Sequence, residues 1–179
     1  MPIDIPQHLR NANYSTGTQL RRLLWGLLTP LFSLSPRPCY ACRSWLLRRL
    51  GARIGKHVRL YPSVRVMFPW NLEIGDDVIV SWNVQLYSLS PIRIGSNVLI
   101  SQGAHLCAGT HDYRQPNLPL VFQPLTIGSG TWLAAECFIG PGVSIGTGCI
   151  VAARAVAVRD VPPDSLVAGN PARIVKTLA

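Results

Sequence analysis

Large aliphatic residues recur at every sixth position over long runs between Ile54 and Val151. A period of six fits neither an amphipathic helix nor a two-sided strand, and it predicts one short strand and one corner per six residues. Most of these residues are followed four positions later by a small or β-branched residue, and many are followed directly by Gly. Both apolar positions are expected to point inward, so that stacked units bury a continuous core. The recurring residues are Ile54, Leu60 and Val66; Ile74, Val80 and Leu86; Ile94, Ile100 and Leu106; and Ile127, Leu133, Ile139, Ile145 and Val151.

Copies of the pattern begin at Ile54, Ile74 and Ile94, so that three six-residue units and two further residues form one predicted coil. We expect an all-β fold: a parallel β-helix of about five coils over residues 54–162, followed by a C-terminal tail over residues 163–179. Cys137 and Cys149 take the small inward position and are therefore expected in the core.

The repeat breaks once, between Thr110 and Ile127, where three prolines interrupt a stretch without periodicity. A break of this length inside a compact domain is unusual unless it serves function. We therefore expect a protruding loop over residues 112–126, with the functional site beside it.

Residues 1–53 are expected to form an N-terminal arm and short helices. The first 19 residues are polar, residues 20–34 are the most apolar stretch, and residues 39–50 have apolar and Arg positions at helical spacing up to Gly51. The apolar stretch contains Gly26 and Pro30 and is shorter than the ~20 residues of a spanning helix. Two interpretations stay open: the helices cover the open end of the β-helix, which we favour, or they anchor the chain to a membrane surface. The second rests on arginines beside the apolar faces, namely Arg21, Arg22, Arg43, Arg48 and Arg49.

The chain has a formal net charge of +9, from 17 Lys and Arg against 8 Asp and Glu. This excess favours an anionic partner such as a phospholipid surface or a phosphorylated cofactor. Nucleic acid is not expected as a partner, because no nucleic-acid-binding motif is found. An odd number of cysteines and no obvious secretory leader favour a cytoplasmic location. Cys39 and Cys42 lack the second ligand pair that zinc requires, so we expect two buried thiols on a helix.

The repeats, the run ISQGAHLCAGTHDY that opens the loop and the tail VRDVPPDSLVAGNPARIV resemble the hexapeptide-repeat O-acetyltransferases. The sequence is most similar to the WcaF-like sugar acetyltransferases of colanic acid biosynthesis, over roughly residues 54–176. The resemblance implies a left-handed β-helix, a homotrimer with active sites between neighbouring chains, and acetyl-CoA as cosubstrate without a metal. It also implies a sugar or lipid-linked saccharide as acceptor, in the synthesis of exopolysaccharide or another cell-surface polysaccharide. The basic, apolar N-terminus would suit work at the inner membrane surface.

His111, where the last regular unit gives way to the loop, matches the catalytic His of the family, so the resemblance implies that it is the general base. It would take the proton of the acceptor hydroxyl as the oxygen attacks the thioester, and then pass it to the CoA thiolate. Its orienting partner stays open between Asp112, Glu136 and a backbone carbonyl. The other histidines lie in the polar arm (His8) or at outward repeat positions that predict solvated side chains (His57 and His105).

The resemblance also implies contacts to the acceptor. Asn83 matches an acceptor-contacting Asn of related galactoside acetyltransferases, and Trp82, Asp112 and Tyr113 are further candidates. The alternatives are an Asn that satisfies a corner of the prism, and aromatic rings that pack at a subunit interface.

For acetyl-CoA, the resemblance implies that Trp132 borders the pantetheine end and that the backbone N–H of Ala135 faces the thioester oxygen. Ala153 matches a backbone contact one coil further along. Ala134 and Ala135 replace the Gly-Ser of related enzymes, which keeps a backbone donor but removes any side-chain contact. The residues placed where the family meets the adenosine phosphates are Arg159, Arg173 and Lys176, with a solvated tail as the alternative.

Three rival functions share this kind of scaffold. Serine O-acetyltransferase would use the same cofactor, but its long N-terminal helical domain is absent and the loop motif fits less well. A γ-class carbonic anhydrase needs three zinc-binding histidines near one interface, and His57, His105 and His111 do not have that spacing. A non-catalytic β-helix scaffold would bind no CoA.

Overall fold

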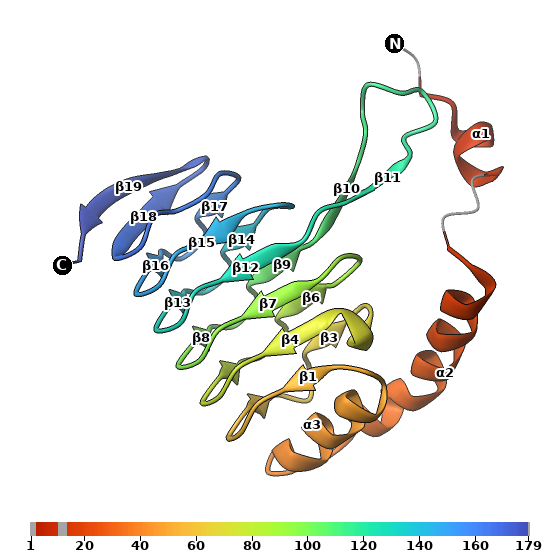
Figure 1. Ribbon diagram of the computed structural model, residues 1–179, viewed down its shortest axis with the longest axis horizontal. Helices are drawn as coiled ribbons and strands as arrows, with labels where there is room; N and C mark the ends of the chain where they lie inside the picture. The colour runs from red at the N-terminus through yellow and green to blue at the C-terminus, as the bar shows by residue number, and fades with distance from the viewer. Residues whose placement is uncertain (1–2, 11–13, 179) are drawn as a thin grey trace.

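The computed structural model describes residues 3–10 and 14–178 of the chain. Short strands stack in parallel into three sheets, and this arrangement confirms the predicted parallel β-helix (Figure 1). Sheet A contains β1 (Arg53–Ile54), β4 (Leu72–Ile74), β7 (Ile92–Ile94), β12 (Leu125–Ile127) and β15 (Ser144–Ile145). Sheet B contains β2 (Arg59–Leu60), β5 (Ile79–Val80), β8 (Leu99–Ile100), β13 (Trp132–Leu133), β16 (Ile150–Val151), β18 (Ser165–Gly169) and β19 (Ala172–Thr177). Sheet C contains β3 (Arg65–Val66), β6 (Gln85–Tyr87), β9 (His105–Cys107), β14 (Phe138–Ile139) and β17 (Val156–Ala157).

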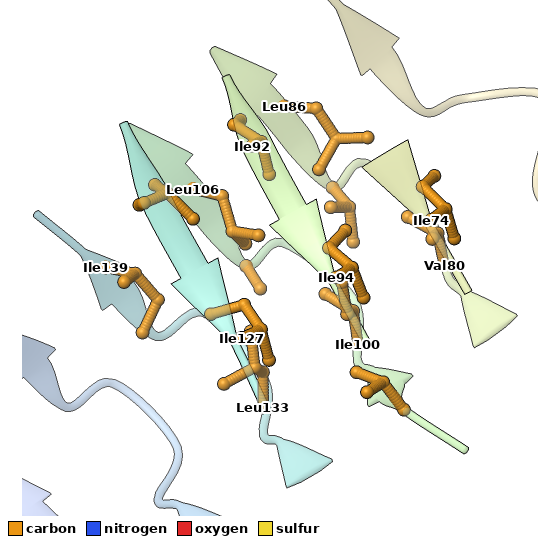
Figure 2. Close-up of a cluster of buried hydrophobic side chains, with 14 of the residues drawn as sticks. Ile74, Val80, Leu86, Ile92, Ile94, Ile100, Leu106, Ile127, Leu133 and Ile139 are labelled. Carbon is orange, nitrogen blue, oxygen red and sulfur yellow. The ribbon is translucent and has the colours of Figure 1, made fainter. Parts of the chain in front are cut away.

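The aliphatic residues of the six-residue period form the core. Ile54 pairs with Ile74, Ile74 with Ile94, and Ile94 with Ile127, so that like residues stack from coil to coil. Their side chains point into the space between the three sheets, as Figure 2 shows for several of them together with Ile92. Cys137 and Cys149 are buried among them, as the repeat predicts.

The chain passes from sheet A to B to C in each coil, so the prism has three edges, which we name AB, BC and CA after the sheets they join. At the BC edge the same corner position has a positive φ in four successive coils: Asn83 (54°), Gly103 (70°), Glu136 (58°) and Arg154 (59°). This left-handed conformation closes each corner, and it favours Gly and Asn over other residues.

The protruding loop leaves the prism at the CA edge, between β9 and β12. Its base is an antiparallel hairpin of β10 (Gly109–His111) and β11 (Leu120–Phe122), which projects away from the sheets (Figure 1). The stacking also continues past residue 162, the expected end of the β-helix, because β18 pairs in parallel with β16 and β19 then folds back on β18.

Three helices precede the β-helix: α1 (Ile5–Arg10), α2 (Thr16–Ser33) and α3 (Tyr40–Arg49). The described residues before Leu20 (3–10 and 14–19) are therefore more helical than the expected polar arm, since they hold α1 and the start of α2. Ser15 caps α2 by accepting a hydrogen bond from the Thr18 amide. As we favoured, the helices cover the first coil: α3 contacts β1, β2 and the short 3₁₀ turn Pro69–Asn71, and Trp25 and Phe32 of α2 join the core. Among the described residues, no helix is both long and apolar enough to cross a membrane.

Two expectations for the helical segment are wrong. Arg43 does not flank an exposed face, because it is buried and donates hydrogen bonds to the carbonyl oxygens of Leu60 and Arg37, both at 2.6 Å. It ties the turn between α2 and α3 to the first coil. The thiols of Cys39 and Cys42 are half-buried and exposed, respectively, rather than both buried.

Candidate active site

His111 ends β10 at the base of the loop, and its ring is exposed. Its Nδ1 lies 2.6 Å from the carbonyl oxygen of Leu118 on the returning side of the loop. Because a carbonyl only accepts hydrogen bonds, Nδ1 carries the proton in this contact, and the lone pair of Nε2 stays free. The loop therefore holds His111 in the tautomer that a general base requires.

The Leu118 carbonyl is the orienting partner of His111, and the two carboxylates considered from the sequence are engaged elsewhere. Asp112 accepts hydrogen bonds from Arg114 and Gln115, and these bonds lower the pKa of the carboxyl group to about 2. Glu136 pairs with Arg154, whose Nε lies 2.7 Å from the carboxylate. Asp112 thus shapes the loop from within, and Glu136 joins two coils.

The BC edge presents backbone N–H groups that have no acceptor among the described residues. They belong to the second corner residue of four successive coils, namely Trp82, Gln102, Ala135 and Ala153. Three of the equivalent amides of the AB edge are capped by side chains: Lys56 donates to Asp76 at 2.6 Å, Asp76 to Ser96 at 3.0 Å, and Ser96 to Ser129 at 3.1 Å. Only the last two, those of Ser129 and Thr147, have no acceptor among the described residues. A row of uncapped donors along one edge can bind the carbonyl oxygens of an extended ligand.

The residues predicted to contact the thioester and the pantetheine arm meet at this edge. Ala135 and Ala153 contribute two of the open amides. Trp132 lies on β13 of sheet B, just before the same corner, with 44% of its surface exposed and its indole N–H donating to Ser101 Oγ at 2.9 Å. Together they form an apolar wall beside a row of donors.

The three basic residues predicted to meet the phosphates are not gathered in one place. Arg173 and Lys176 are both exposed on β19, the last strand of sheet B. Arg159 follows β17 of sheet C and lies at the CA edge, ahead of the bridge between Val161 and Ile145. Within one chain, two of the three cations therefore extend the face that carries Trp132.

The candidate acceptor residues are also divided between two edges. Trp82 and Asn83 lie at the BC edge, where the Trp82 ring packs on Tyr61 at 4.6 Å between centroids and Arg37 lies over it at 5.0 Å. Tyr113 lies in the loop and is 82% exposed. The left-handed φ of Asn83 accounts for an Asn at this corner, and its side chain remains exposed.

His105 departs from the expected solvated side chain. Its ring lies edge-to-face with Tyr87 and Phe138, with centroids 6.2 and 5.3 Å away, and its Nε2 is buried with no hydrogen-bond partner among the described residues. Burial lowers the pKa of this imidazole. His57 is exposed, as expected, and contacts Asp77 at 2.9 Å.

His8 is the residue beside His111 that the sequence did not reveal. Their ring centroids are 5.3 Å apart, and His8 contacts the loop carbonyl of Asn117. No motif signals this contact, because it depends on where α1 meets the loop. No group of three or more His, Cys, Asp or Glu side chains able to hold a metal ion occurs in the part of the chain that the structure describes.

His111 and the open amides belong to different edges of the same prism. The hairpin that carries His111 starts from the CA edge, whereas Ala135 and Ala153 lie at the BC edge, with sheet C between them. A base and an oxyanion donor must both lie within about 3 Å of the reacting atoms. Within one chain, His111 and the open amides are therefore not brought together at one place.

A scan against models of known protein families finds no match. Individual proteins are similar over most of the chain. The Escherichia coli protein WcaF, which carries the name of a colanic acid biosynthesis acetyltransferase, is 39% identical over 155 residues, or 87% of this chain and 85% of that protein. The galactoside O-acetyltransferase of Escherichia coli is 27% identical over 76% of this chain and 68% of that protein. A solved structure of a hexapeptide-repeat acetyltransferase from Vibrio cholerae, complexed with acetyl-CoA, has a TM-score of 0.86 and 32% identity, and covers 93% of this chain and 92% of that one.

Proposed function

This chain belongs to the WcaF-like hexapeptide-repeat acetyltransferases of the left-handed β-helix fold, and we propose that it transfers acetyl from acetyl-CoA to a sugar hydroxyl with His111 as general base. The acetyltransferase activity and the use of acetyl-CoA follow from the family. One observation supports the role of His111 above the others: the Leu118 carbonyl binds Nδ1 at 2.6 Å and leaves Nε2 free.

In the proposed reaction, Nε2 of His111 takes the proton of the acceptor hydroxyl as its oxygen attacks the thioester carbonyl. The new C–O bond forms the ester, the C–S bond breaks, and the departing CoA thiolate receives the proton from His111. The negative charge on the thioester oxygen is stabilised by the Ala135 N–H, one of the open amides of the BC edge. The acetyl group passes directly, without a covalent enzyme intermediate.

On the acetyl-CoA side, we propose that the pantetheine arm runs along the BC edge past Trp132, with Ala153 as a further backbone contact. Arg173 and Lys176 would pair with the phosphates at the end of sheet B, and Arg159 would come from the neighbouring chain. We propose a homotrimer, as the family resemblance implies; a closed cyclic arrangement of this kind gives each CA-edge loop one BC edge of a neighbour.

On the acceptor side, Asn83, Trp82, Asp112 and Tyr113 are proposed contacts to a sugar or lipid-linked saccharide of a cell-surface polysaccharide. A thioester-consumption assay over neutral sugars, amino sugars and L-serine tests the substrate class. We expect turnover with at least one saccharide and none above acceptor-free hydrolysis with serine. Turnover with serine alone would identify a serine acetyltransferase. No turnover, together with no binding of CoA, would favour a non-catalytic scaffold.

The charge distribution supports a location at an anionic membrane surface. Residues 5–72 contain 11 Lys and Arg and no Asp or Glu, whereas the rest of the chain contains 6 basic and 8 acidic residues. The whole positive excess thus lies in the helices and the first coil. A basic segment of this kind is attracted to anionic headgroups.

Helix α2 adds an apolar face to this basic segment. Six leucines at helical spacing are largely exposed along it: Leu20, Leu23, Leu24, Leu27, Leu31 and Leu34. The opposite face carries Trp25 and Phe32, which are buried against the prism. An amphipathic helix with a free apolar face and basic surroundings fits a position in the headgroup region, parallel to the membrane.

Flotation with vesicles tests this location. We expect the protein to float with phosphatidylglycerol vesicles at low salt and not with phosphatidylcholine vesicles. Leu27→Gln with Leu31→Gln should abolish flotation, whereas Leu99→Gln, an exposed leucine of sheet B, should not. Wild-type protein that stays unbound would contradict the location. If the double variant floats like the wild type but its oligomer has a different mass, the leucine face of α2 serves contacts between copies of the chain instead.

A further inference from the structure

We infer that His8 is a positioning residue, which holds the loop carbonyl that orients His111; the inference rests on the proposed role of His111. Three consecutive carbonyl groups of the loop carry the argument. The Asp4 amide donates to Pro116 O at 2.8 Å, His8 Nδ1 lies 2.9 Å from Asn117 O, and His111 Nδ1 lies 2.6 Å from Leu118 O. We call Asp4, His8 and these carbonyls the N-terminal clamp.

Like His111, His8 faces a group that can only accept, so its Nδ1 is the donor. The two imidazole rings also meet edge-to-face, with centroids 5.3 Å apart and planes at 63°. His8 therefore restrains both the loop segment before Leu118 and the ring of His111 itself.

The loop needs such a restraint at Leu118. This residue has a φ of 44°, in the left-handed region that a leucine rarely adopts, and such a conformation persists only where its surroundings hold it. Within the loop, the Leu118 amide donates to Gln115 O at 3.1 Å, and the Asp112 amide donates to Pro119 O at 2.9 Å. The clamp fixes the remaining two carbonyls from outside.

Helix α1 has little other attachment. Both hydrogen bonds that join residues 3–8 to the rest of the described chain go to the loop. The side chains of Ile3 and Ile5 are 60% and 50% exposed, so α1 buries little apolar surface. A six-residue helix is not stable alone in water, which means that α1 and the loop order each other.

Paired variants of the full-length protein separate positioning from simple folding. His8→Phe keeps an aromatic ring but removes the donor, and His8→Asn keeps a donor near the place of Nδ1. Gln7→Ala is the control, because Gln7 is an exposed neighbour whose side chain makes no hydrogen bond with the described residues. The measurements are kcat and KM for acetyl-CoA and for the best acceptor, together with the thermal midpoint.

We expect His8→Phe to lower kcat by about tenfold, as the loss of one orienting hydrogen bond predicts, with the KM for acetyl-CoA and the thermal midpoint unchanged. His8→Asn should restore most of kcat. Wild-type kcat in His8→Phe, or an equal loss in His8→Asn, would overturn the clamp. If His111→Ala itself keeps full turnover, the proposed function fails instead, whatever His8 does.

Discussion

At the corner residues of the BC edge, the backbone conformation restricts which residue type is favoured. Asn83, Gly103, Glu136 and Arg154 all adopt the left-handed conformation, although only Gly and Asn favour it. Asn83 therefore has a structural role, because Asn tolerates the positive φ of this corner, whether or not its side chain also contacts the acceptor. A substitution by glycine separates the two roles, because glycine keeps the corner conformation but removes any contact of the side chain with the acceptor.

Replacing Asn83 by Ala and by Gly separates these roles. Ala should lower the free energy of unfolding by about 1 kcal/mol, because its Cβ disfavours a positive φ, whereas Gly should leave the corner unstrained. If the side chain binds the acceptor, both variants raise the acceptor KM, and only Ala lowers stability. Chemical denaturation and acceptor titrations measure the two effects. An unchanged acceptor KM in the Gly variant would mean that Asn83 has only the structural role at the corner.

Ala135→Pro tests the oxyanion donor without removing a side-chain contact. Pro62 already occupies the equivalent corner position in the first coil, so this corner accepts the fixed φ of proline. We expect kcat to fall ~10²- to 10³-fold, as for the loss of one oxyanion donor, with little change in thermal midpoint. Ala153→Pro is the matched control, since it should weaken acetyl-CoA binding more than kcat. An Ala135→Pro enzyme with full kcat would exclude this amide.

The sequence predicted individual residues well wherever a residue type carries the signal. The inward Cys137 and Cys149 follow from the period, and the position of His111 follows from the break in it. The hydrogen-bond partner of His111 could not be identified in this way, because no residue type indicates that a backbone carbonyl, such as that of Leu118, will accept a hydrogen bond. The contact of His8 was missed for a related reason: it depends on the path of a loop without periodicity.

Among the elements, the corner glycine Gly128 of the β-helix and the helix glycine Gly26 differ in the space around them. A Cβ built on Gly128 would lie 2.5 Å from backbone atoms of Gly146 and Thr147 in the next coil. A Cβ on Gly26 in α2 would meet nothing within 4 Å. The same substitution thus has opposite consequences in the two kinds of element.

Gly128→Ala should lower the free energy of unfolding by about 2 kcal/mol or more, because backbone atoms cannot move aside as a flexible side chain can. Gly26→Ala should raise it by up to about 1 kcal/mol through helix propensity. Thermal or urea denaturation of both variants checks the pair. Equal stability of the two would show that the coils are not packed as closely as described.

The elements were predictable to different degrees. The strands of the six-residue period repeat one pattern that is tied to burial, so their order could be anticipated, whereas β18 and β19 lie past the expected end of the β-helix and were missed. The helices α1 and α2 begin in a polar segment whose helicity depends on the caps at Asp4 and Ser15 and on contacts with distant parts of the chain. The hairpin of β10 and β11 has no alternation that would distinguish it from an irregular loop.

For the molecule as a whole, the two halves of the proposed site lie on different edges of one prism, so the proposed reaction would depend on assembly. Co-assembled His111→Ala and Ala135→Pro chains should recover activity, because a site formed by the loop of one chain and the BC edge of another is intact in some mixed trimers. Random mixing in equal amounts predicts about a quarter of wild-type activity. Each variant alone is the control. No recovery from verified mixed trimers would mean that both halves come from one chain.

The most direct test of the proposed chemistry is the turnover of His111→Ala on the best acceptor, measured by CoA release under saturating acetyl-CoA. His57→Asn, a substitution of another exposed histidine that tolerates its left-handed φ, is the control. We predict that kcat of His111→Ala falls ~10²- to 10⁴-fold, as for the loss of a general base, while His57→Asn stays at wild-type level. A His111→Ala enzyme that retains full kcat would contradict the assignment of His111 as the base.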